Sequence, residues 1–189
     1  MAKIGLTNLW YGKLTEGVDG TPTYDGAHSF GKAISCNVEI TNNEAKLYAD
    51  DTLAESDTSF NNGTMTLGVD EDSDVVFADV LGHTVDSNGA VVKKSTDTAP
   101  NVGVGRVITK MVNGLYKYKA EFIYKIKFAE PSAEDNTKGE SVEFATPEIE
   151  GQIASLSDSD GTWCTTKTFD TKADAVDFIK DILGGNASL

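Results

Sequence analysis

The chain has 189 residues, of which 39% are hydrophobic, so it can bury one sizeable core and we expect a single domain over residues 1–189. Asp and Glu number 30 against 16 Lys and Arg, which gives a formal net charge of -14. Proteins that grip nucleic acid cluster cations to replace the counterions of the phosphates, so this charge argues against a DNA-binding groove.

The N-terminal residues lack the apolar run of a secretory signal, and no stretch approaches the ~20 apolar residues of a membrane span. We therefore expect the chain to stay in the cytosol where it is made. Cys36 and Cys164 have no Cys or His neighbour at metal-ligand spacing, so we interpret both as reduced, structural thiols.

The first predicted strand follows a turn-rich segment, residues 15–31. Apolar residues then alternate with small or polar ones at Ile34, Cys36, Val38 and Ile40, which indicates a half-buried strand. The next stretch, residues 41–63, is polar, with five acids and one lysine. It exceeds the ~12–15 residues at which structureless loops become uncommon, so it is either disordered or built to contact another molecule. Its scattered apolar residues favour contact.

A short strand and a helix are predicted next. Alternation at Met65, Leu67 and Val69 indicates the strand. Ser73 is a candidate N-cap for a helix in which apolar side chains recur four residues apart, and Gly82 is its expected end.

Two Asn-Gly pairs predict β-hairpins. Asn88-Gly89 lies between residues 83–85 and 90–92, and Asn113-Gly114 joins two long runs. The outgoing run alternates along its whole length, which predicts one face made of Tyr116, Tyr118, Ala120, Phe122, Tyr124, Ile126 and Phe128.

The opposite face of that run carries four lysines, so we expect acidic partners on neighbouring strands. The candidates are Glu140, Glu143, Glu148 and Glu150.

Short strands are predicted over 140–145 and 148–153, separated by Pro147, and a turn at Asp160-Gly161 leads into a strand over 162–169. A helix over about 171–183 closes the chain, with Asp170 or Thr171 as its cap. The elements together predict a mainly β domain, a β-sandwich or open barrel with one flanking helix and a C-terminal helix.

Three motif-like segments fail as ligand sites. Residues 26–33 have the spacing of a phosphate loop but end in Ala33 instead of a hydroxyl residue and lead into a strand. The acids 70, 72 and 74 copy part of a calcium loop without its glycine and closing Glu. Residues 103–105 are a fragment of a dinucleotide fingerprint, and their glycines better indicate a bulge or a close backbone approach.

Catalytic chemistry has no support in the sequence. His28 and His83 have no Cys, Ser or acid at motif spacing, so we interpret both as solvated or hydrogen-bonded structural residues. Trp10, Tyr11 and Trp163 are more typical of a β-protein core than of a sugar site. We expect no enzyme activity, no cofactor and no bound metal.

Several blocks resemble, in order, the major tail proteins of long-tailed bacteriophages with non-contractile tails. They span nearly the whole chain together with the final helix. The blocks are YADDTLAESD (48–57), VGVG (102–105), VNGLYKY (112–118), KFAEPS (127–132), TKGES (137–141) and FATP (144–147).

The resemblance implies a tail-tube β-sandwich with a flanking helix, assembled into stacked hexameric rings around a channel for DNA ejection. The implied partners are further copies of the chain, a tape-measure scaffold, and tail terminator and baseplate proteins. Genomic DNA would pass through the lumen without specific binding, past a wall whose acids repel phosphate. The implied location is the virion tail, and the host cytoplasm during assembly.

By the same analogy, residues 41–63 are the long inter-subunit loop that reaches a neighbouring subunit or ring. The candidate contact residues are Leu47, Tyr48, Asp50, Asp51, Leu53, Glu55 and Asp57. Two rival interpretations remain open: the tube of a contractile or secretion-type injection machine, and a β-sandwich binding module.

Overall fold

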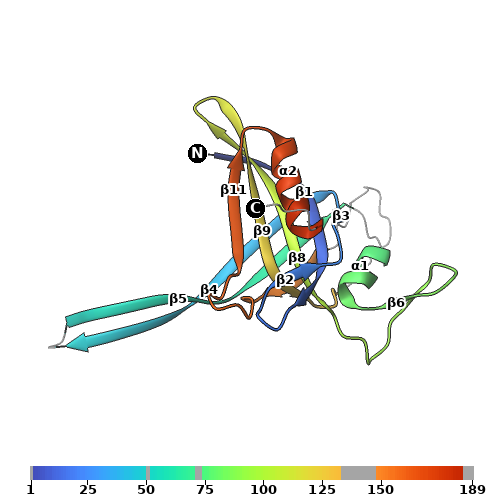
Figure 1. Cartoon of the computed structure of the whole chain (residues 1–189), viewed down its shortest axis with the longest axis horizontal. Coiled ribbons are helices and arrows are strands. Elements are labelled where there is room, and N and C mark those ends of the chain that lie inside the picture. Colours follow the sequence, from blue (N-terminus) through green and yellow to red (C-terminus); the bar gives the residue numbers. More distant parts are fainter. Residues whose placement is uncertain (1, 50–51, 71–73, 133–147, 185–189) are drawn as a thin grey trace, which may run out of the picture.

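The structure, a computed structural model, describes residues 2–49, 52–70, 74–132 and 148–184. The protein is mainly β, as predicted, with the strands antiparallel and two helices in the described ranges (Figure 1). The elements are β1 (Ala2–Glu16), β2 (Pro22–Tyr24), β3 (His28–Gly31), β4 (Ala33–Ala49), β5 (Thr52–Val69), α1 (Asp74–Leu81), β6 (Thr84–Val85), β7 (Val91–Val92), β8 (Asn101–Val112), β9 (Leu115–Phe128), β10 (Glu148–Ile153), β11 (Cys164–Phe169) and α2 (Lys172–Gly184).

One large sheet contains every described strand except the small β6–β7 hairpin. Its order is β2-β1-β8-β9-β10-β5-β4, with β3 added to β1 and β11 added to β9. The strand β9 changes partner along its length, because Tyr118–Ile123 pair with β11 while Ile126–Phe128 pair with β10. The β8–β9 hairpin is therefore the centre of the fold.

The first strand, β1, went unpredicted although it is 15 residues long. Its pairing with β8 shifts register twice, between Lys3 and Gly5 and between Thr7 and Trp10. Asn8 takes a left-handed conformation (φ 56°) within the second shift. Each extra residue reverses the alternation of side chains, so no continuous period of two exists for sequence reasoning to detect.

The hairpins predicted at the two Asn-Gly pairs are present. At the β8–β9 turn, Asn113 (φ 51°) and Gly114 (φ 78°) both lie in the left-handed region, as a two-residue turn of the mirror-image type I requires. The β6–β7 hairpin closes differently, because in its Asn-Gly pair only Gly89 (φ 85°) lies in the left-handed region and its backbone N–H donates to the Asp86 carbonyl oxygen (3.1 Å).

The single apolar face predicted for β9 is wrong beyond Tyr124. The register between β8 and β9 shifts between Val102 and Val104, so that Ile123 and Ile126 both reach the main core. Ala120 and Phe122 instead pack on the opposite face. The bulge turns the strand over at the point where its partner changes, a common role for an inserted residue.

The main core lies on the face of β8–β9 that is turned away from α2. It joins apolar side chains of β1, β3, β5, β9 and β10 and is capped by α1. Its largest fully buried members include Phe30, Met65, Leu67, Ile126 and Ile149. The predicted N-cap of α1, Ser73, lies outside the described residues, whereas Gly82 (φ 78°) follows the helix as expected.

The other face of β8–β9 is covered by α2 (Figure 1). Thr171 caps this helix: its hydroxyl accepts a hydrogen bond from the Asp174 backbone N–H (3.2 Å) and donates one to the Asp174 carboxylate (2.6 Å). Ala175, Ile179 and Leu183 form the buried stripe. The helix expected from the sequence is therefore present within one residue of its predicted bounds.

The acidic partners expected for the β9 lysines are mostly different ones. Lys117 pairs with Asp170, Lys119 with Glu121 on its own strand, and Lys125 with Glu16 of β1. Glu148 and Glu150 lie opposite β5 and make no ion pair with a described β9 lysine. Glu140 and Glu143, like the predicted strand over 140–145, lie outside the described residues.

The close approach of α2 to β8 is possible because residue 105 is a glycine, which has no side chain. A Cβ built there would lie 2.2 Å from Ile179 Cγ2. We expect Gly105→Ala to lower the free energy of unfolding by about 1–3 kcal/mol, because the helix must move outward. Urea unfolding of this variant tests the contact, with Gly5→Ala as a control because nothing lies within 4 Å of a Cβ at Gly5. An unchanged stability for Gly105→Ala would contradict it.

Candidate assembly surface

The most unusual feature of the fold is a hairpin arm, residues 41–62, formed by the distal halves of β4 and β5. The sheet partner of β5, β10, stops at Gly63, and beyond it β4 and β5 pair only with each other. About nine residue pairs at roughly 3.3 Å each give a length of about 30 Å. Figure 1 shows the arm projecting away from the rest of the molecule.

The arm corresponds to the segment expected to be a long loop, which is thus a paired ribbon. Its register places Leu47 opposite Glu55, Tyr48 opposite Leu53, and Asp57 opposite Ala45. Five of the seven candidate contact residues therefore sit on two adjacent strands near the far end of the arm. Asp50 and Asp51 lie outside the described residues.

The base of the arm is fixed to the body by an aromatic stack. Phe60 of β5 and Trp163, just before β11, lie parallel with ring centroids 4.7 Å apart. Next to them, a Cβ at Gly63 would meet the Glu39 carbonyl oxygen at 2.8 Å, so the two arm strands are in tight contact there. The arm is consequently anchored at its base and free of the sheet further out.

A buried charged cluster contacts β4 at Cys36, five residues before the arm. Arg106 of β8, 8% exposed, donates from Nε to Glu121 Oε1 (3.0 Å) and from Nη1 to the Cys36 sulfur of β4 (2.7 Å). Lys119 donates to the other Glu121 oxygen (2.7 Å). Burial by itself raises the pKa of Glu121, but Lys119 and Arg106 outweigh it and hold that pKa below its usual range. Burial raises the pKa of the Cys36 thiol, which stays protonated.

Several strand edges are unpaired within the described part of the chain. They include the outer edges of β4 and β11, and residues 2–8 of β1, which pair only with β8. Open edges present rows of unused N–H and C=O groups to any strand of suitable length. The fold thus offers several places for a neighbouring chain to extend the sheet.

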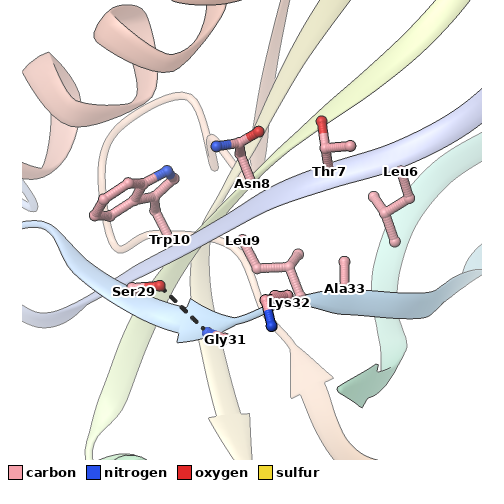
Figure 2. A pocket seen from close by; sticks show the side chains of 9 residues that line it. All are labelled: Leu6, Thr7, Asn8, Leu9, Trp10, Ser29, Gly31, Lys32 and Ala33. Atoms are coloured by element: carbon pink, nitrogen blue, oxygen red, sulfur yellow. Dashed lines mark hydrogen bonds between the residues drawn. The ribbon is translucent and has the colours of Figure 1, made fainter. Parts of the chain in front are cut away.

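The open edge of β1 borders a cleft of about 510 Å³ where β1 separates from β3 and β4 (Figure 2). Leu9 and Ala33 project into the space between the strands, and Trp10 lies at one end. Among the described residues, Thr7 Oγ1 and Trp10 Nε1 are buried without a hydrogen-bond partner. The cleft lies where the pairing of β1 with β3 ends, at Leu9 and Gly31.

A second charged cluster lies at the opposite end of the core. His83 follows α1, is 9% exposed, and contacts Asp97 through Nδ1 (2.8 Å) and Glu130 through Nε2 (2.9 Å). A neutral imidazole can donate from one nitrogen only, so both contacts require the charged ring. Hydrogen bonds to Asp97 and then to Glu130 raise the pKa of His83. His83 is therefore a structural residue, as predicted.

This cluster gives a pH dependence of stability. Because the folded-state pKa of His83 is raised, its contribution is fully present below about pH 6.5, the unfolded value, and is lost as the pH rises through the folded pKa. We expect the unfolding temperature to fall over that interval, and the fall to be smaller in His83→Gln. Proton NMR titration checks the cause directly, with His28 as the only other histidine. A His83 pKa at or below 6.5 would contradict it.

The described residues of the motif-like segments make contacts within the chain, and Asp72 lies outside the described residues. Asp70 accepts a hydrogen bond from the Lys32 backbone (3.1 Å) and pairs with its ammonium (3.2 Å), so it closes the β3–β4 connection. Gly103 and Gly105 lie in β8 against Tyr24 and Ile179, the close approach expected of them. Among the residues described, no three His, Cys, Asp or Glu side chains are grouped to hold a metal ion. No helix in the described ranges has the length and apolarity to cross a membrane.

Sequence reasoning missed two contacts: that of Arg106 with β4, and the aromatic stack at the base of the arm. Arg106 gave no signal because a single charge inside an apolar run of β8 does not reveal its partner on β9. The Phe60–Trp163 stack joins residues 103 positions apart, which no local pattern predicts. Comparison of the sequence with protein-family models and with curated proteins gives no match.

Proposed function

We propose that this chain is a structural subunit that polymerises with copies of itself, as stacked hexameric rings, into the tail tube of a long-tailed bacteriophage with a non-contractile tail. The observation that carries the proposal is the arm: about 30 Å of two paired strands that, in the described chain, pair with no third strand beyond Gly63. A two-stranded ribbon is marginally stable alone, so an arm of this length needs a surface to rest on. A neighbouring copy supplies one.

The finer fold belongs to the same proposal, a tail-tube sandwich with a flanking helix. Arg106 on β8 contacts Cys36 on β4, the last strand in the sheet order, so the sheet curves back on itself around the main core. The helix α2 flanks the outer face. This arrangement supports a sandwich-like subunit whose open edges lie at its rims.

Ring closure follows from the edges. The outer edge of β11 on one copy and an open edge of β1 or β4 on the next are different surfaces, so their contact is head-to-tail. Head-to-tail contacts close into a ring when the rotation permits, and arms that leave the ring plane connect rings into a tube. The strand edges supply the ring, and the arm supplies the stacking.

The remaining partners follow from the resemblance: a tape-measure scaffold, tail terminator and baseplate proteins, and DNA that passes without specific binding. The net charge of -14 supports the last point, since an acidic wall repels phosphate. We assign the chain no catalytic role.

Sedimentation velocity over a range of protein concentrations tests the proposal. We expect discrete species at one and six subunits, followed by larger multiples of six as concentration rises or when the scaffold protein is added. A sharp monomer boundary under every one of these conditions would overturn it.

A further inference from the structure

Three lysines stand side by side across three neighbouring strands at the end of the sheet near the β8–β9 turn. Lys3 of β1 is the register partner of Lys110 of β8, and Lys110 is the register partner of Lys117 of β9. Residues directly opposite on antiparallel strands lie on the same face with Cβ atoms about 4.5–5.5 Å apart. The three ammonium groups therefore form one row, which we call the lysine row.

The lysine row is only partly neutralised inside the chain. Lys117 pairs with Asp170, but in the described part of the chain neither Lys3 nor Lys110 has an ion-pair partner. Glu121, a largely buried carboxylate on β9, is already held by Arg106 and Lys119. Like charges directly opposite each other destabilise a sheet, so this arrangement opposes folding in a chain that has acids in excess.

Such local conflicts with sheet-pairing rules are expected at functional positions. The row lies on the face turned away from α2, because Lys110 alternates with Val107 and Thr109 and shares its side with Arg106. It therefore lies beside residues 2–8 of β1, whose other edge is unpaired in the described chain. An acidic strand that paired with that edge would bring carboxylates to the row.

We propose that the lysine row is the docking site for the acidic arm of a second copy of this chain. The inference rests on the proposed function, since it names the surface that receives the arm. Residues 41–62 carry five acids against one lysine, and that lysine, Lys46, already pairs with Glu44 (2.9 Å). Glu55 and Asp57, on the strand of the arm with no lysine, supply the complementary charge.

Charge complementarity favours the arm over nucleic acid as the occupant. Duplex DNA would have to approach a chain of net charge -14 for the sake of three ammonium groups, whereas proteins that hold DNA commonly place six to ten cations on phosphates. The arm has matching opposite charge and unused backbone groups along its edges. Both of its outer edges are unpaired beyond Gly63 in the described strands.

The test compares Lys3→Glu/Lys110→Glu with the control Lys94→Glu/Lys127→Glu, which makes the same change of charge at exposed lysines elsewhere. Both variants should fold, as thermal unfolding will show, because neither Lys3 nor Lys110 has a partner to lose in the described chain. We expect the lysine-row variant to raise the concentration for half-assembly by about tenfold or more, and the control to change it little.

A charge-swap experiment tests whether the lysine row pairs specifically with the acids of the arm. We expect Glu55→Lys/Asp57→Lys alone to impair assembly to a similar degree, and the chain that carries both double substitutions to recover most of it. If the lysine-row variant assembled as well as the unmodified chain, the inference would be overturned and the proposed function would stand. The same would follow if the chain with both double substitutions assembled no better than either double variant. If the unmodified chain fails to assemble, both fall. If the lysine-row variant assembled normally but no longer shifted duplex DNA in a gel, the row would be assigned to nucleic-acid binding instead.

Discussion

Replacing Leu47, Tyr48 and Leu53 together by serine is expected to abolish tube assembly while leaving the fold of the subunit intact. These residues lie on adjacent strands in the outer part of the arm, beyond the last residue paired with β10. Because β4 and β5 pair only with each other at these positions in the described chain, we expect the body to fold without these three side chains. Truncating anchor residues of an interface typically costs about 1–4 kcal/mol each, so the assembly concentration should rise more than 100-fold.

The matched control removes three exposed apolar side chains outside the arm. Val18, Val85 and Val92 are all at least 39% exposed, and we expect their replacement by serine to leave assembly unchanged. Negative-stain microscopy and sedimentation read out assembly, and circular dichroism reads out the fold. Normal tubes from the arm variant would show that the arm is not the contact element.

The second large effect is expected at Arg106. Arg106→Ala leaves the Glu121 carboxylate buried with Lys119 as its only cation, and removes the hydrogen bonds to Cys36 of β4. Breaking one side of a buried ion pair typically costs 3–5 kcal/mol, and because Lys119 remains we expect about 3 kcal/mol. In a chain of this length that lowers the unfolding temperature by about 6–12 °C.

Two comparisons isolate the cause. Lys117→Ala removes an ion pair whose acid, Asp170, is 80% exposed, so it should cost less than about 1 kcal/mol. Because the folded-state pKa of Glu121 is lowered, the contribution of its pairing is present at neutral pH and is lost as the pH falls through that pKa. The difference between Arg106→Ala and the unmodified chain should shrink in acid. A stability within 0.5 kcal/mol of the unmodified chain at pH 7 would contradict the role of Arg106.

The local elements could largely be read from sequence because their signals are local. Asn113-Gly114 specifies its turn through the two residues that tolerate positive φ, and Thr171 with Asp174 specifies the start of α2. The strand over residues 33–40 followed from its alternation, although Ile34 is half exposed.

The features that could not be predicted from the sequence depend on the register between strands that are distant in the chain. The bulge in β9 puts Ile126 on the opposite face from Phe122, and a one-residue shift leaves no trace in composition. The lysine row exists only because β1, β8 and β9 pair in one particular register.

The arm lies between these cases. The sequence of residues 41–63 predicts a segment that is disordered or contacts another molecule, because an unstructured polar stretch of that length is uncommon in a compact domain. The pairing of this segment as two strands was not expected, because few of its residues favour strands and its apolar residues do not alternate regularly with polar ones. The ribbon instead follows from continuing the register of the preceding part of β4 and β5, where Cys36 pairs with Leu67 and Val38 with Met65.

Electron cryo-microscopy of the filament or virus particle that contains this chain tests the central claim most directly. The account predicts stacked rings of identical subunits, each with its arm, residues 41–62, against another copy and its lysine row facing carboxylates of that arm. A particle in which the chain occurs as a single copy, or in which the arm folds back on its own subunit, would contradict it.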